Sequence, residues 1–176
     1  APLHGAVLTG DAIGLALEKY TQWSTYQPEE KGVLVAYASI HGNTAKAALE
    51  LVDMLKAEGV KVEAIDLTRE DWAKAVAKAF QYTNLVLAAS TYDNFVFTPM
   101  ATFLYRLKTK AFQNRTVALV ENGTWAPLAA KEMRAALDQL KNITVMDQVV
   151  TIRSALDDTS RAALGELAKA VKATLD

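Results

Sequence analysis

The 176-residue chain contains no cysteine and only two histidines, His4 and His41. Without cysteine, these residues can form neither a disulfide nor a thiolate-ligated iron–sulfur cluster, and they carry no cysteine nucleophile. Two separated imidazoles do not make the set of several imidazole and carboxylate ligands that a metal centre requires. We therefore expect a chain that holds no metal of its own.

An excess of charge of one sign and long hydrophobic runs are missing as well. The 19 basic and 20 acidic side chains leave a net charge of -1, which argues against binding to nucleic acid or to an anionic membrane surface. No apolar run is long enough to span a bilayer, and the first thirty residues lack the pattern of a signal peptide. We expect no nucleic-acid or membrane partner and a cytoplasmic location. Because the chain begins with Ala1 and not with methionine, we expect it to be a piece of a larger protein.

Short apolar runs alternate with amphipathic stretches from Gly32 onward. This alternation is typical of a parallel sheet with helices on both faces, so we predict an α/β fold with a doubly wound, five-stranded parallel sheet. The length and the 51% hydrophobic composition indicate one domain with a short extension. The expected strands are residues 33–38, 60–66, 85–90, 116–120 and 143–152.

Helices are predicted between and after these strands. In the first of them, apolar residues fall on one face and Gly59 follows the last turn. The second helix is expected to have Thr68 as its N-cap, with Asp71 three residues on, and the fourth to hold Pro127 in its first turn. The expected helices are residues 45–58, 70–80, 100–108, 126–140 and 157–175.

The first thirty residues lie outside this alternation. Residues 11–23 have a helical pattern, and the polar segment 24–30, which contains a proline, is typical of a linker. We therefore divide the chain into an N-terminal extension and linker, residues 1–30, and one α/β domain, residues 31–176.

The loop after the first expected strand has the composition of a phosphate site. Ser39 and Thr44 can donate hydroxyl protons to phosphate oxygens, Gly42 permits a tight backbone turn, and the dipole of the following helix favours an anion. A Walker A loop and a dinucleotide-binding glycine fingerprint are both absent, so a monophosphate held by neutral donors, as in flavin mononucleotide (FMN), is the better candidate. An ordinary helix N-cap formed by Ser or Thr fits this loop about equally well. The candidate residues are Ser39, Ile40, His41, Gly42, Asn43 and Thr44.

Two further loops are expected at the same end of the sheet, where ligands of open α/β sheets bind. Tyr92 and Phe95 follow the third strand and Trp125 follows the fourth, and aromatic rings supply flat walls for a planar ligand. Asn122 and Gly123 offer amide donors to the polar edge of such a ring. The alternatives are a core tryptophan at Trp125 and a loop pinned by its own aromatics at Tyr92 and Phe95. The candidate residues are Ser90, Thr91, Tyr92, Asp93, Asn94, Phe95, Asn122, Gly123, Thr124 and Trp125.

Together these segments resemble the flavodoxin-like domain of flavodiiron proteins, the multidomain flavoproteins that reduce nitric oxide or dioxygen. The Asn-Gly-Thr-Trp element is the specific one, because flavodoxins at large share the first loop. Residues 2–5 and 20–24 also resemble the end of the metallo-β-lactamase-like domain that precedes this module in the family. The resemblance is carried in the main domain by residues 37–44, 90–93, 99–100, 103–104, 114–115 and 121–127.

This resemblance implies an FMN-binding electron-transfer domain of an oxidoreductase. Electrons would come from a rubredoxin or a flavin reductase and pass to a diiron centre of the neighbouring domain, supplied by the other subunit of a head-to-tail dimer. The parent protein would be a homodimer or larger. His4 would match its last iron ligand and is expected to be orphaned in this chain, which alone should show no efficient reduction of nitric oxide or dioxygen. His41 stands where relatives often carry tyrosine or another bulky residue.

Other functions are also open to a chain of this fold class. It could be a self-contained flavodoxin-like carrier, or an NAD(P)H-dependent quinone reductase, for which no nicotinamide motif is evident. A phosphorelay receiver would need an aspartate at the end of the third strand, which instead ends Ala88-Ala89-Ser90. A visible absorption spectrum separates a receiver from the flavoproteins, and a quinone reduction assay separates the flavoprotein functions from one another.

Overall fold

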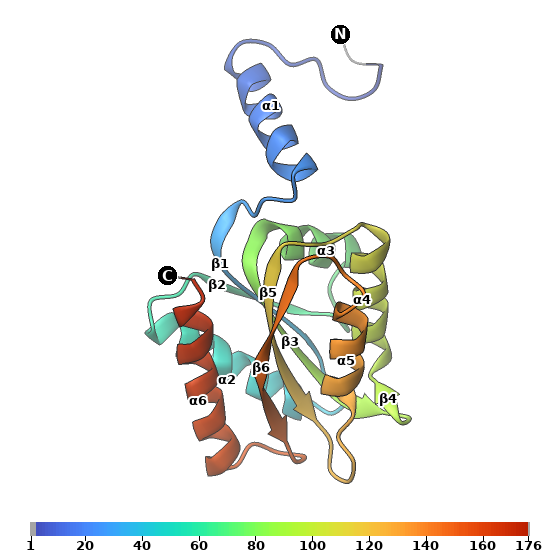
Figure 1. Ribbon diagram of the computed structural model, residues 1–176, viewed down its shortest axis with the longest axis vertical. Helices are drawn as coiled ribbons and strands as arrows, with labels where there is room; N and C mark the ends of the chain where they lie inside the picture. Colours follow the sequence, from blue (N-terminus) through green and yellow to red (C-terminus); the bar gives the residue numbers. More distant parts are fainter. Residues whose placement is uncertain (1–2, 176) are drawn as a thin grey trace.

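The computed structural model describes residues 3–175. Ala1, Pro2 and Asp176 lie outside the described residues, and Pro2 is one of the residues 2–5 that carry the N-terminal resemblance. The strands are β1 (Glu30–Ala38), β2 (Val62–Asp66), β3 (Tyr82–Tyr92), β4 (Phe95–Val96), β5 (Arg115–Asn122) and β6 (Ile143–Ile152). Five of them form a parallel sheet in the order β2-β1-β3-β5-β6, and the two-residue β4 pairs antiparallel with β3. The predicted doubly wound sheet is therefore confirmed (Figure 1).

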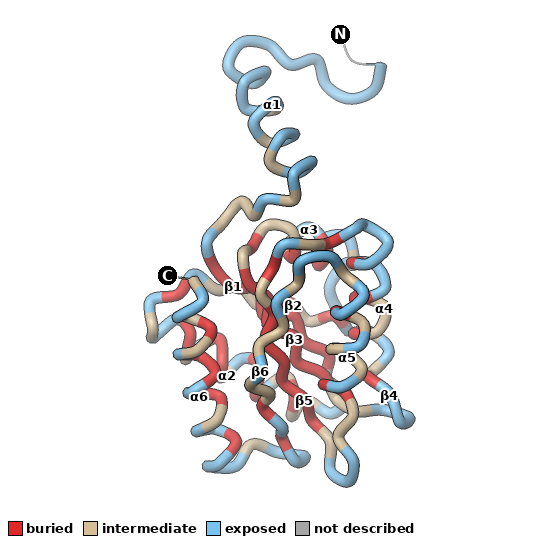
Figure 2. Tube along the Cα trace, in the orientation of Figure 1, coloured by how far each residue is buried: buried red, intermediate tan, exposed pale blue. Residues whose placement is uncertain are grey.

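Helices cover both faces of this sheet. They are α1 (Asp11–Ser24), α2 (Asn43–Ala57), α3 (Trp72–Gln81), α4 (Thr98–Thr109), α5 (Ala129–Leu137) and α6 (Asp158–Ala173). α2 and α6 pack on one face, α3, α4 and α5 pack on the other, and α1 stands apart from the sheet (Figure 1). No residue of α1 is buried (Figure 2). Within residues 3–175, no helix has the length and apolarity needed to cross a bilayer.

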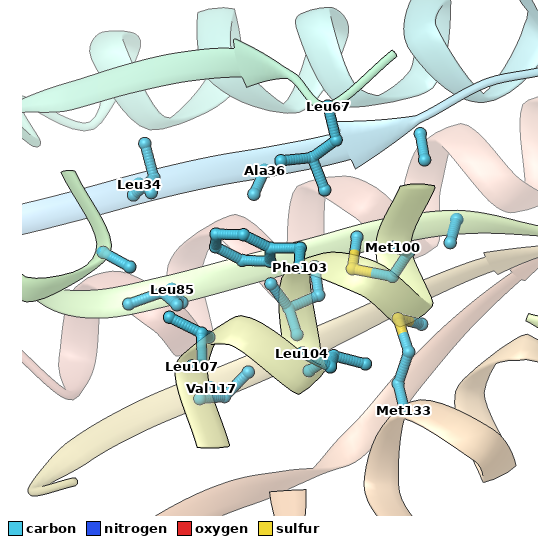
Figure 3. Close-up of a cluster of buried hydrophobic side chains, with 14 of the residues drawn as sticks. Leu34, Ala36, Leu67, Leu85, Met100, Phe103, Leu104, Leu107, Val117 and Met133 are labelled. Atoms are coloured by element: carbon cyan, nitrogen blue, oxygen red, sulfur yellow. The ribbon is translucent and has the colours of Figure 1, made fainter. Parts of the chain in front are cut away.

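The side chains of the central strands alternate between two hydrophobic clusters. Leu34 and Ala36 of β1 belong to the cluster beneath α3, α4 and α5, whereas Val33 and Val35 belong to the cluster beneath α2 and α6. Figure 3 shows the first cluster, in which Phe103 of α4 packs against the strands. Burial on both faces explains why the strands appear in the sequence as continuous apolar runs.

The strand order reverses between β1 and β3. From β1 the chain crosses through α2 to β2 on one side, and α3 then returns it to β3 on the other. The loops that follow β1, β3 and β5 therefore meet at the carboxyl ends of the strands, at the switch point of the sheet. α1 lies beyond the opposite end of the sheet (Figure 1).

Two helices begin two or three residues later than the sequence indicated. Asp71 caps α3, because its carboxylate accepts hydrogen bonds from two backbone N–H groups of the first turn. Thr68 instead bonds the side chain of Asp66, so the prediction that Thr68 caps this helix is wrong. α5 begins at Ala129, and Pro127 precedes the helix instead of lying in its first turn. The N–H groups at the start of α5 bond side chains of the sheet, and these bonds fix its first residue.

Arg115, the first residue of β5, ties the predicted linker to the domain. Its buried guanidinium donates to the backbone carbonyls of Tyr26, Phe80 and Tyr82 at 2.8, 2.7 and 2.8 Å. Burial lowers the pKa of Arg115 to about 10, so the group is still charged at neutral pH, with carbonyl oxygens in place of a carboxylate partner. The end of the linker therefore packs on the sheet, and β1 begins within it at Glu30.

Candidate functional site

The loop between β1 and α2 leaves the start of the helix open. Gly42 takes a left-handed conformation, with φ 90°, immediately before α2, and a residue with a Cβ would be strained there. The Ser39 hydroxyl accepts a hydrogen bond from the Gly42 N–H at 3.0 Å, and no side chain caps α2. This loop therefore does not form the ordinary N-cap considered above. Because the first N–H groups of a helix have no partner within it, α2 presents donors and the positive end of its dipole at this loop.

A pair of hydroxyls joins this loop to β3. Thr44 Oγ1 lies 2.8 Å from Ser90 Oγ, and either oxygen can be the donor. Thr44 is only 1% exposed. Each hydroxyl has one proton and two lone pairs, so the bond between them leaves one hydroxyl proton available to a ligand acceptor.

The segment after Ser90 forms a hairpin, not an open loop. Asp93 and Asn94 are its two-residue turn, both left-handed with φ 52° and 56°. The Tyr92 ring packs edge-on against Phe97, with 5.8 Å between the centroids, and remains 53% exposed. Phe95 lines a separate groove between α4 and α5. The aromatic residues of this segment thus face different surroundings, and Tyr92 keeps a ring open to a ligand.

Asn122, the last residue of β5, is held by the loop that follows β6. Its amide nitrogen donates to the Ser154 carbonyl at 2.9 Å, and its amide oxygen accepts from the Ser154 N–H at 3.1 Å. The Gly123 N–H donates to the Ile152 carbonyl at 3.0 Å. The Gly123 N–H and one of the two N–H groups of the Asn122 amide are therefore bonded within the protein, and these bonds fix the start of the loop that follows β5. Ser154 was not predicted, because only the loops at the switch point were considered and Ser154 follows β6 at the edge of the sheet.

Gly123 lets the loop after β5 fold back on the end of β3. A Cβ at this position would lie 2.9 Å from Pro127 Cα and 3.1 Å from Thr91 Oγ1. Thr91 Oγ1 in turn accepts hydrogen bonds from the Leu128 N–H at 2.9 Å and from the next N–H at 3.1 Å. Trp125, at the tip of the loop, is 95% exposed. The alternative of a core tryptophan at this position is therefore wrong.

A cavity of about 180 Å³ lies where these segments meet. Most of the predicted site residues line it, and the unpredicted Ser154 completes the lining. The predicted residues outside the lining are Gly42, which shapes the first loop, the four residues of the hairpin from Tyr92 onward, and Trp125. The lining residues that the sequence predicted are Ser39, Ile40, His41, Asn43, Thr44, Ser90, Thr91, Asn122, Gly123 and Thr124.

Metal ligands do not gather in the part of the chain that the structure describes. No group of three or more His, Cys, Asp and Glu side chains between residues 3 and 175 is placed to hold an ion. The segment before α1, which contains His4, lies beyond the far end of the sheet (Figure 1), whereas His41 lines the cavity.

Sequence comparisons find relatives that are longer than this chain. No family model matches it. The chain is 31% identical over 117 residues to a coenzyme F420H(2) oxidase from Methanothermobacter marburgensis, covering 66% of this chain and 28% of that protein. It is 26% identical over 138 residues to a putative diflavin flavoprotein A 2 from Thermosynechococcus vestitus, covering 78% and 24%. The matched part thus spans about a quarter of the length of these relatives.

Solved structures share the fold. The rubredoxin oxygen:oxidoreductase from Desulfovibrio gigas has a TM-score of 0.86 at 18% identity, over 94% of this chain and 41% of that one. A flavodiiron protein from Giardia intestinalis has a TM-score of 0.84 at 22% identity, over 97% and 43%. A flavodoxin from Streptococcus pneumoniae TIGR4 has a TM-score of 0.67 at 18% identity, over 81% of this chain and 98% of its own.

Proposed function

We propose that this chain, a flavodoxin-like domain of the kind found in flavodiiron proteins, binds one FMN and transfers electrons through it. Its sequence and structural relatives support a flavin-binding electron-transfer domain. One observation carries the choice of FMN: the cavity at the switch point joins the uncapped start of α2 to the hydroxyls of Ser39, Thr44 and Ser90.

The residues around this cavity fit a monophosphate. Its donors are hydroxyls and helix N–H groups, which suit a single phosphate group without a cationic side chain. Ser39, Asn43 and Thr44 would hold the phosphate, and Tyr92 and Trp125 offer exposed aromatic surface on the neighbouring loops for the isoalloxazine ring. Bound FMN supplies one- and two-electron chemistry, and the task of this chain is to bind and orient it.

The partners follow from the resemblance to flavodiiron proteins. We assign a rubredoxin or a flavin reductase as the donor and a diiron centre outside this chain as the acceptor, in a homodimeric or larger parent that reduces nitric oxide or dioxygen. Residues 1–30 would be the end of the upstream diiron domain and its linker, with His4 an orphaned iron ligand. Flavodiiron structures cover 92–98% of this chain and flavodoxins cover 81–82%, which supports an extension beyond the flavodoxin module.

Titration of the flavin-free chain with FMN and with riboflavin tests the proposal. Flavin fluorescence should fall on binding because ring stacking quenches it, with an endpoint at one FMN per chain. FMN should bind roughly tenfold or more tighter than riboflavin, because only FMN has a phosphate to accept charge-assisted hydrogen bonds. Equal affinities would contradict the phosphate site. NAD(P)H-dependent quinone reduction by the loaded chain would favour a reductase, and stoichiometric iron would require ligands not recognised in this sequence.

A further inference from the structure

Glu121 is a buried carboxylate without a cationic partner. It is the next-to-last residue of β5 and is 7% exposed. No ion pair among residues 3–175 includes it. A buried charge is costly unless hydrogen bonds compensate for the lost water. Glu121 Oε2 accepts from the Ala130 N–H at 2.9 Å, and Oε1 accepts from the Thr151 hydroxyl at 2.9 Å.

The start of α5 depends on this carboxylate because the helix has no cap of its own. Its N-cap residue, Leu128, has no side chain that can accept a hydrogen bond. Thr91 of β3 accepts from the N–H groups of Leu128 and Ala129, and Glu121 of β5 accepts from the third, that of Ala130. Two neighbouring strands thus share the capping of one helix through hydrogen bonds to side-chain oxygens.

We propose that Glu121 is a positioning residue of the cavity. By fixing the first turn of α5 to the end of β5, it closes the loop of residues 123–127 at both ends, the other end being held by the bond from the Gly123 N–H. The loop then carries Thr124 into the cavity lining and presents Trp125, the next residue along the chain, to solvent. The effect on flavin binding rests on the proposed function, whereas the anchoring of the loop does not.

Two single variants separate the reach of this side chain from its charge. Glu121→Gln keeps the length: its amide oxygen can accept from the Ala130 N–H, and its amide nitrogen can donate to the Thr151 hydroxyl. Glu121→Asp keeps the charge but is one methylene too short to span both partners. Positioning through hydrogen bonds predicts that Glu121→Gln resembles the wild type and that Glu121→Asp does not.

Amide hydrogen exchange of the flavin-free chain is the primary measurement. In Glu121→Asp, peptides spanning residues 123–131 should exchange roughly fivefold faster than in the wild type, as expected for the loss of one hydrogen bond. The exchange rates of α2 peptides should be unchanged in Glu121→Asp. The Glu121→Gln variant should keep the wild-type exchange rates throughout. Equal exchange of residues 123–131 in all three proteins would overturn the proposal. So would exchange of this segment in Glu121→Gln that is as fast as in Glu121→Asp. If Glu121→Asp fails to fold, a folded Glu121→Gln variant with wild-type exchange supports the proposal and one with faster exchange at residues 123–131 overturns it.

FMN titration then shows whether the anchored loop matters to the ligand. Glu121→Asp should raise the Kd for FMN roughly tenfold and reduce the quenching of bound flavin, whereas Glu121→Gln should leave both unchanged. A wild-type chain that binds no FMN would defeat the proposed function alone, because the exchange experiment needs no flavin. Loosened exchange with an unchanged Kd in Glu121→Asp would overturn the assignment of Glu121 to the cavity.

Discussion

Thr44 Oγ1 and Ser90 Oγ form a 2.8 Å hydrogen bond that joins the first turn of α2 to the end of β3. The two residues lie on either side of the switch point, where the strand order turns from β1 to β3. One hydroxyl pair therefore links α2 to the end of β3 across the cavity, and the hydroxyl proton that remains for a ligand depends on both members.

Thr44→Val should weaken the binding of FMN and leave the binding of riboflavin nearly unchanged. The variant keeps the shape of the side chain but removes a hydroxyl, and a hydrogen bond to a charged group is worth about 1.5 to 3 kcal/mol. Isothermal titration with each flavin measures the difference, with Thr109→Val at the exposed end of α4 as the matched control. An equal loss for both flavins would show that Thr44 acts on the fold of the loop and not on the phosphate.

Trp125→Ala should lower flavin affinity and the quenching of bound flavin without changing the stability of the flavin-free chain. The side chain is 95% exposed, so its removal should alter the free energy of unfolding by no more than about 0.5 kcal/mol. Urea unfolding and flavin fluorescence measure the two effects. Tyr105→Ala, an exposed aromatic in the groove between α4 and α5, is the control that should change neither. Unaltered quenching and affinity in Trp125→Ala would remove Trp125 from the site.

Gly123→Ala should destabilise the chain, whereas Gly165→Ala should not. The new Cβ at position 123 would lie 2.9 Å from Pro127 Cα, a backbone atom that cannot turn aside, and such overpacking costs about 1 to 3 kcal/mol. At Gly165, within α6, a Cβ meets nothing within 4 Å, and alanine should stabilise the helix by about 0.5 to 1 kcal/mol. Thermal unfolding of both variants checks the contrast; a neutral Gly123→Ala would mean that the loop has room to move.

The ionisation of Tyr82 should destabilise the fold at high pH. Burial and a hydrogen bond to the Glu63 carboxylate raise the pKa of Tyr82 from 10.0 to about 12. Because the folded pKa exceeds the unfolded one, the stabilisation is complete below about pH 10 and is lost as the pH rises through about 12. Relative to Tyr82→Phe, the wild type should lose about 2 to 3 kcal/mol of unfolding free energy across this range. Parallel stability curves for the two proteins would contradict the raised pKa.

The strands and the meeting of three loops at one edge of the sheet could be predicted because their signals are local. Alternating apolar runs define the strands, and parallel strands must end at the same edge of the sheet, so the loops after residues 38, 90 and 122 had to lie together. The hairpin was missed because β3 extends two residues beyond Ser90 and β4 is only two residues long, too short to give a periodic apolar pattern. The left-handed pair Asp93 and Asn94 was the turn signal available.

Contacts between distant segments account for what the sequence could not predict. The Asn122 amide is the kind of side chain that binds a ligand, yet it forms two hydrogen bonds with the backbone of Ser154, which lies 32 residues away. Phe95 lines the groove between α4 and α5, and this groove exists only because the two helices pack side by side. The start of α5 was misplaced for the same reason, since its capping groups come from β3 and β5 and not from its own sequence.

Arg115 joins the N-terminal extension to the strand that leads into the site. Its guanidinium donates to the carbonyl of Tyr26 at one end of β5, and the other end of the same strand carries Glu121 and Asn122. The extension and the loop that bears Trp125 are therefore attached to opposite ends of one strand, which fixes where the extension leaves the domain relative to the site.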